Sequence, residues 1–198
     1  AVVPHPPLLI PNIGKDELKK IEATKAALEK LEEDLYLSKP EVILIISPHG
    51  SLFKDAFCVN AHTHFESNFG EFGDMDTKLA WKGSDFLAAK LGHMANEAKI
   101  PLQLISEDHL DHGASVPLFY LTQHLPDVKI LPIGYSILDN KSHLNFGELI
   151  KEFIMDSGKR VAIIASGDLS HCLTSSAPAG FKKEGQEFDD LILQSVKD

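Results

Sequence analysis

Short, continuously apolar runs alternate along the chain with longer segments of helical period. Glu41 to Ser47 (EVILIIS) is rich in β-branched residues and closed by Pro48, which is typical of a strand buried on both faces of a parallel sheet. From Lys15 to about Ser38, Leu and Ile recur at helical spacing between charged residues, which predicts an amphipathic helix. We expect further strands at 1–3, 53–60, 102–105, 128–136 and 161–166, and further helices at 84–99, 114–124, 141–156 and from 184 onward.

This alternation of strands and helices predicts an α/β fold of three layers, α/β/α, with a central sheet that is mainly parallel or mixed. Residues 61–76 are rich in His, Phe and Gly without a period, so we expect a long surface loop there. The composition does not change along the chain in a way that would indicate a second domain, so we expect a single domain over residues 1–198. Because the chain starts without Met and stops inside an expected helix, we also expect it to be truncated at the C-terminus.

Charge and cysteine content exclude several classes of protein. Nineteen Lys and Arg stand against 29 Asp and Glu, a formal net charge of -10, and the basic residues form no run, so a nucleic-acid partner is not expected. The apolar runs are too short to cross a bilayer and no signal-peptide pattern opens the chain, so we expect no membrane partner and a cytoplasmic location. Cys58 and Cys172 have no paired spacing, which suits a reducing compartment.

The distribution of histidines is the main chemical signal. Four of the ten follow a predicted strand: His5 in VVPHPP, His49 in IISPHG, His112 in LDHG and His171 in ASGDLSH. Ligand sites in such sheets lie beyond the carboxyl ends of the strands, so we expect all four to meet at one rim. Pro4 and Pro6 flank His5, and Pro48 precedes His49, which limits the backbone entropy lost when these side chains are fixed in place.

Two imidazoles and a carboxylate form the facial arrangement that leaves coordination positions free on iron(II), although the same ligands accept zinc, copper or manganese. His5 and His49 are our first choice as metal ligands. Asp168, three residues before His171, would set the tautomer of a general acid/base or cap the turn after the strand. His112 could donate to substrate or bound oxygen.

Other residues have a plainer interpretation. Asp111 is as well placed to cap a turn as to act in chemistry. His62 and His64 could bind a metal as a pair, but a solvated loop is the better prediction. Cys172 is expected to be a buried neighbour of His171 and not a nucleophile. Phosphate-loop, GxSxG, HExxH and CxxC motifs do not occur.

Four segments resemble a known family. VPHPPLLIP, IISPHG, LDHGASVPL and ASGDLSH occur in the order of the motifs of LigB-type class III extradiol dioxygenases, and GFKKEGQEFDDLI resembles the Memo-like "AmmeMemoRadiSam system protein B" branch. The resemblance covers nearly the whole chain. It implies that His5 and His49 bind iron(II), that His171 is the acid/base and that His112 lies in the substrate pocket. An aromatic diol would bind the iron and react with O2, which opens the ring to a hydroxymuconic semialdehyde.

The same resemblance bears on the third ligand and on partners. In the dioxygenases that ligand is a Glu well C-terminal of the acid/base histidine, and in Memo-like proteins a Cys can occupy that region. Only 27 residues follow His171, so we expect the ligand beyond Asp198 and not at Glu184 or Glu187. A homo-oligomer or a partner subunit covering the pocket also fits the resemblance.

Three functions remain open at this point. The first is an iron(II)-dependent extradiol dioxygenase or a close oxidoreductase relative. The second is a Memo-like protein that binds a metal or a partner without cleaving a ring. The third is a zinc hydrolase in which His171 is the base to a metal-bound water.

Overall fold

The structure, a computed structural model, describes residues 1–177 and 179–196. Its strands are β1 (Val2–Val3), β2 (Val42–Ser47), β3 (Phe57–Asn60), β4 (His64–Phe69), β5 (Asp74–Gly83), β6 (Leu102–Ile105), β7 (Lys129–Gly134) and β8 (Val161–Ser166). Its helices are α1 (Pro11–Gly14), α2 (Glu22–Ser38), α3 (Asp85–Glu97), α4 (His112–Leu121), α5 (Asn140–Asp156) and α6 (Lys183–Ser195), with the 3-10 turns η1 (Pro7–Leu9), η2 (Lys15–Ile21) and η3 (Gly70–Phe72).

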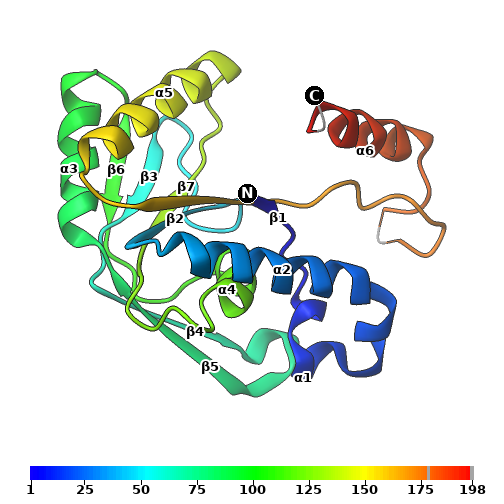
Figure 1. Ribbon diagram of the computed structural model, residues 1–198. Coiled ribbons are helices and arrows are strands. Elements are labelled where there is room, and N and C mark those ends of the chain that lie inside the picture. Colours follow the sequence, from blue (N-terminus) through cyan, green and yellow to red (C-terminus); the bar gives the residue numbers. More distant parts are fainter. Residues whose placement is uncertain (178, 197–198) are drawn as a thin grey trace. The chain divides into compact units, whose positions relative to one another are not determined.

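The chain forms two compact units, Ala1–Ser166 and a second that begins at Gly167. The first contains the sheet and α1 to α5, and the second contains α6 (Figure 1). Whether the two behave as the single domain expected over 1–198 stays a prediction.

The sheet of the first unit is mainly parallel, as predicted. Its strand order is β1-β8-β2-β7-β3-β6, and β1, β8, β2 and β7 pair in parallel. β3 runs antiparallel to β7 but parallel to β6. The parallel strands therefore bring their carboxyl ends to one edge of the sheet.

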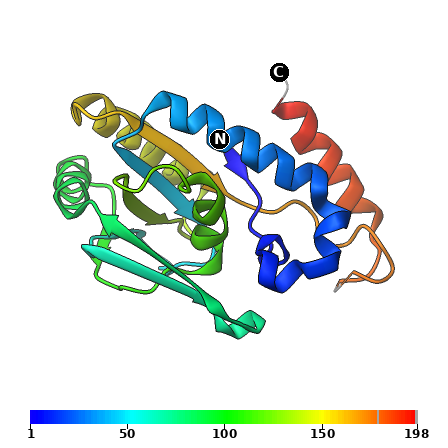
Figure 2. The same cartoon turned by 60° about the horizontal axis from the view of Figure 1, so that its bottom comes forward.

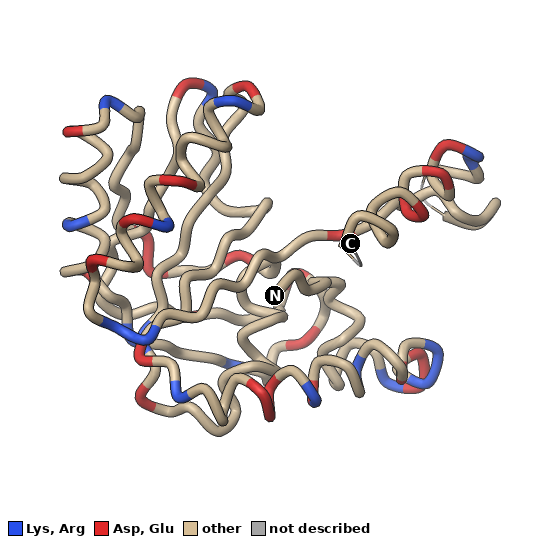
Figure 3. The backbone as a smooth tube through the Cα atoms, turned by 45° about the horizontal axis from the view of Figure 1, so that its top comes forward, with Lys and Arg blue, Asp and Glu red and all other residues tan. Residues whose placement is uncertain are grey.

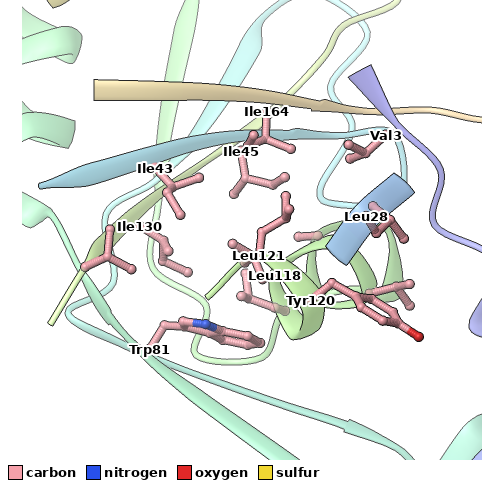
Figure 4. Close-up of a cluster of buried hydrophobic side chains, with 14 of the residues drawn as sticks. Val3, Leu28, Ile43, Ile45, Trp81, Leu118, Tyr120, Leu121, Ile130 and Ile164 are labelled. Carbon is pink, nitrogen blue, oxygen red and sulfur yellow. The ribbon is translucent and has the colours of Figure 1, made fainter. Parts of the chain in front are cut away.

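Helices cover both faces of the sheet, which confirms the three-layer α/β/α prediction (Figure 1). Because successive side chains of a strand point to opposite faces, Ile43 and Ile45 of β2 join the core with α2 and α4, whereas Val42 and Leu44 join the core with α3 and α5. Figure 4 shows Ile43 and Ile45 facing α4 in the first of these cores. Burying an aliphatic side chain of this size stabilises a fold by about 1.5–3 kcal/mol.

The prediction of a surface loop at residues 61–76 is wrong. This segment forms most of an antiparallel hairpin of β4 and β5, whose strands run side by side in Figure 2. In β4 exposed and buried positions alternate, so Phe65 and Phe69 enter the core while His64, Glu66 and Asn68 face outward. The alternation is obscured because Ser67, a polar residue, occupies a buried position between Phe65 and Phe69.

Other elements agree with prediction except at their ends. The helix expected from Lys15 begins as the 3-10 turn η2 and becomes α-helical at Glu22, and the strand expected from Phe53 begins only at Phe57. Helix α4 starts at His112, two residues before the predicted start, because Asp111 caps it: its side chain accepts from Ala114 N. Such N-caps are stabilising, since they pair an amide that the helix leaves unbonded.

Most charged residues lie on the outside of the elements, whereas Glu32, Asp74 and Asp189 are buried. On α2, Lys25 pairs with Glu29 and Lys30 with Asp34, and exposed pairs of this kind contribute little stability. Figure 3 shows Lys and Arg distributed over helices and turns and not gathered into one stripe. In the part of the chain that the structure describes, none of the helices combines the length and apolarity that crossing a bilayer demands.

Candidate metal centre

The ends of three neighbouring strands bring His5 and His49 together. In the register of the sheet, Val3 pairs with Ser166 and Ile46 pairs with Ala165, so β1, β8 and β2 end at the same level. Each of these histidines stands two residues beyond the end of its strand. The rim predicted from the sequence is therefore formed by strand register, and it places residues 44 positions apart in contact.

His5 is held firmly, because its side chain is buried and both of its ring nitrogens have neighbours. The residue is 2 % exposed, its Nδ1 lies 2.8 Å from Ser166 Oγ, and its Nε2 lies 3.0 Å from His49 Nε2. With the proton on Nδ1 and donated to Ser166 Oγ, the lone pair of Nε2 is on the side of His49 Nε2. Metal-binding histidines are commonly oriented in this way by a second hydrogen bond.

A third imidazole, His112, joins the pair from the first turn of α4. The centroid of its ring lies 4.2 Å from that of His49 and 5.7 Å from that of His5. One nitrogen from each of the three histidines falls within a group whose atoms lie no more than 4.8 Å apart. Phe72 of the hairpin packs edge-on against His112, with centroids 5.1 Å apart.

These donors fit a divalent first-row metal. Two nitrogens bound at about 2.1 Å and at a right angle lie about 3.0 Å apart, which is the spacing of His5 Nε2 and His49 Nε2. Neutral imidazole suits zinc, copper, iron and nickel. His5 and His49 would therefore hold the ion, with His112 beside it.

The close approach of α4 to the strand ends depends on Gly113. A Cβ at this position would lie 2.5 Å from Ser47 Oγ, 2.8 Å from Asp111 Oδ1 and 3.1 Å from His49 Cδ2. Ser47 Oγ donates to Asp111 Oδ1 at 2.5 Å and accepts from the backbone amide of His49 at 3.2 Å. The cap of α4 and the loop of His49 are thus joined through one hydroxyl.

The group of three histidines borders a cavity of about 640 Å³ that His49 and His112 help to line. This is large enough for a one-ring aromatic molecule. Cys58 also lines the cavity, and burial, with a smaller effect of the Glu107 carboxylate, raises the pKa of its thiol to about 11. The thiol is therefore protonated at neutral pH and is a poor nucleophile or metal ligand.

The second unit holds His171 and Asp168. His171 Nε2 lies 3.2 Å from Asp168 Oδ2, and the histidine side chain is 65 % exposed. Cys172 is half-buried, with its Sγ 2.9 Å from Ser170 Oγ. The contact between His171 and Asp168 agrees with the sequence, but the place of His171 at the rim and its acid/base role stay predictions.

Two further expectations concern other ligands. The third metal ligand expected beyond Asp198 lies outside the described residues, and His112 is the additional donor that the structure brings to the pair. His62 Nδ1 lies 2.8 Å from Ser106 Oγ, whereas His64 Nδ1 lies 3.1 Å from Thr63 Oγ1, so each has its own local neighbour. Ser47 and Ser166 were not identified as site residues from the sequence. Each is the polar residue that ends an otherwise apolar strand, and each is followed directly by a histidine motif.

Comparison with known proteins gives several relatives. Protein CA_C1420 of Clostridium acetobutylicum is 30% identical over all of this chain and 44% of its own length. A MEMO1 family protein of Methanosarcina mazei is 27% identical over 84% of this chain and 55% of its own. The 4,5-DOPA dioxygenase extradiol of Mirabilis jalapa is 25% identical over 91% of this chain and 70% of its own.

The chain thus spans about half the length of the first two relatives. A crystal structure of the uncharacterized protein JW3007 from Escherichia coli K12 shares the fold, with a TM-score of 0.55, 22% identity and coverage of 74% of this chain and 53% of that one. The family model described as the catalytic LigB subunit of aromatic ring-opening dioxygenase matches residues 1–198. Through this match, which includes both units and all four histidine motifs, the chain belongs to the LigB family.

Proposed function

We propose that this protein is a non-haem iron(II)-dependent, extradiol dioxygenase-like oxidoreductase that opens a catechol-type ring with O2. The observation that carries the proposal is the group of three imidazoles, with donor atoms within 4.8 Å, at a cavity of about 640 Å³. The family match and the relative named 4,5-DOPA dioxygenase extradiol support it. In the overall reaction one ring C–C bond breaks and both atoms of O2 enter the product.

The side chains divide the work as follows. His5 and His49 would hold the metal, and the hydrogen bond with Ser166 would orient His5. When bound, iron(II) supplies Lewis-acid and redox chemistry that amino-acid side chains lack. His112 lines the cavity and would donate to the diol or to oxygen, while Phe72 packs edge-on against its ring. His171, with its tautomer set by Asp168, would accept the proton of the diol.

The first experiment is anaerobic iron(II) binding followed by metal analysis, on this chain and on His5→Ala and His49→Ala variants. Stoichiometric iron that is lost in both variants is the expected result. His93→Ala is the matched control, because His93 lies exposed on α3 and pairs only with Glu97 in its own helix. Iron binding indifferent to His5 and His49 would contradict the metal centre.

His112→Ala then separates the two roles open to this histidine. Loss of iron would make it a ligand. Retained iron with a higher KM for the diol would make it a substrate donor. An oxygen electrode and a panel of catechols measure the second property.

A second candidate, a Memo-like protein that binds a metal or a partner without cleaving a ring, is favoured by the match to a MEMO1 family protein at an identity close to that of the dioxygenase. Iron or zinc bound without oxygen uptake on any catechol would support it. Oxygen uptake with formation of the yellow semialdehyde product would exclude it.

A further inference from the structure

The charge of the cavity is a feature that the proposed reaction leaves unexplained. Three carboxylates line it, those of Glu71, Glu107 and Asp111, and the described lining residues include neither Lys nor Arg. A substituent that projects from a bound ring away from the metal would face these carboxylates, with no Lys or Arg of the described lining beside it. The lining therefore points to substrates of the opposite sign.

Glu107 is exposed, but hydrogen bonds hold both its carboxylate and its backbone. Ser51 Oγ lies 3.1 Å from Oε1 and 3.0 Å from Oε2 of its carboxylate, and donates to it. Asn60, which is 8 % exposed, clamps the backbone: its Nδ2 donates to Glu107 O at 2.8 Å, and its Oδ1 accepts from Glu107 N at 3.2 Å. The negative charge is thus held at a defined place on the cavity wall.

The three carboxylates differ in how far their charge is offset. Asp111 accepts from Ser47 and from Ala114 N at the start of α4, where the helix dipole favours a negative charge. Glu71, at the tip of the β4–β5 hairpin, and Glu107 form no ion pair with any residue in the ranges 1–177 and 179–196. Glu107 also adds, after burial, to the raised pKa of the Cys58 thiol, another residue of the lining. Glu71 and Glu107 are therefore the charges available to a ligand.

We propose that this cavity selects aromatic diols that carry an ammonium group and disfavours those that carry a carboxylate, with Glu107 and Glu71 as the residues that discriminate. The diol part rests on the proposed function. The charge part rests on the lining alone. Two partly exposed carboxylates that attract one ligand and repel the other should separate their affinities by about tenfold at low salt, and less at high salt because the charges are screened.

The test is anaerobic calorimetric binding of three ring-matched ligands to the full chain: 3,4-dihydroxyphenethylamine, 3,4-dihydroxyphenylacetate and the neutral 4-methylcatechol. The amine should bind about tenfold more tightly than the acid, with the neutral ligand between them. Glu107→Gln and Glu71→Gln should each reduce that ratio about threefold. Glu148→Gln, which removes the same charge from an exposed position on α5 outside the cavity, should leave the ratio unchanged.

The outcomes separate this inference from the proposed function. Equal affinities, binding of none of the three ligands, or a ratio that Glu148→Gln alters as much as Glu107→Gln would overturn the inference. A preference for the amine without cleavage of any diol would leave the inference standing and contradict the dioxygenase proposal. Cleavage of diols without regard to their charge would support the dioxygenase proposal and contradict the inference about charge.

Discussion

The histidines of the first unit and the histidine of the second are held in different ways. His5 is 2 % exposed, and its neighbours His49 and Ser166 are 44 and 161 residues away in the sequence. His171 has a side chain that is 65 % exposed and contacts Asp168, three residues away. One site depends on the register of a sheet, and the other depends on a local turn.

The difference matters for what each region can do. A metal ligand must be held in a fixed position before the ion arrives, since ordering it afterwards costs conformational entropy. The buried His5 meets this requirement, and the exposed His49 is placed against it by the neighbouring strand end. A proton carrier must instead exchange with solvent or substrate, and an exposed imidazole with a carboxylate neighbour is suited to that task. Matched residues in the two units should therefore differ in thiol reactivity, and matched substitutions should differ in their effects on metal affinity and stability.

The largest expected difference is in thiol reactivity. At pH 9 a thiol with a pKa of about 11 is roughly one-hundredth thiolate, whereas an unperturbed thiol is at least about half thiolate, so Cys58 should react with iodoacetamide about 50–80-fold more slowly than in the urea-unfolded chain. Its rate should rise as the pH approaches 11, because the thiolate is the nucleophile. Cys172, which is half-buried, should label readily. Mass spectrometry of timed samples measures both sites, and equal rates at Cys58 in the folded and unfolded chain would refute the expectation.

The next difference is in metal affinity. Ser166→Ala removes the hydrogen bond to His5 Nδ1 and should weaken iron(II) or zinc(II) binding about 10–100-fold, because the orientation of the ligand is lost. Asp168→Asn, which alters the neighbour of His171, should leave the affinity unchanged. Competition with a chromophoric chelator gives both constants. Equal losses in the two variants would mean that the second unit supports the metal as directly as β8 does.

A matched pair of glycines tests whether the close packing of α4 against the strand ends is needed for stability and metal binding. Gly113→Ala should destabilise the protein by about 1–3 kcal/mol and loosen metal binding, because its Cβ would lie 2.5 Å from Ser47 Oγ. Gly167→Ala, where nothing lies within 4 Å of the added Cβ, should change the free energy of unfolding by less than about 0.5 kcal/mol. Urea unfolding of the two variants is the measurement. A stable Gly113→Ala with full metal affinity would show that α4 can shift away from the strand ends without loss.

Much of the fold could be predicted because its signals are local. The apolar run of β2, the helical period of α2 and the alternation of strands with helices are properties of neighbouring residues, and together they predict a three-layer α/β/α fold. The position of His5 and His49 just after strands was likewise visible, because parallel strands share the edge at which their carboxyl ends meet. The β4–β5 hairpin was not predicted because the buried face of β4 includes a polar residue, Ser67, which interrupts the alternation of polar and apolar residues.

The sequence pattern could not predict the contacts between residues that are far apart in the sequence. The neighbours of His5 depend on Val3 pairing with Ser166, and the approach of His112 depends on Gly113 fitting beneath Ser47. The fixed carboxylate of Glu107 depends on Ser51 and Asn60, which lie 56 and 47 residues away. Local propensity selects elements, whereas strand order and register select which side chains meet. Residue composition and spacing therefore identify the kind of chemistry, and the tertiary packing decides which atoms can take part in it.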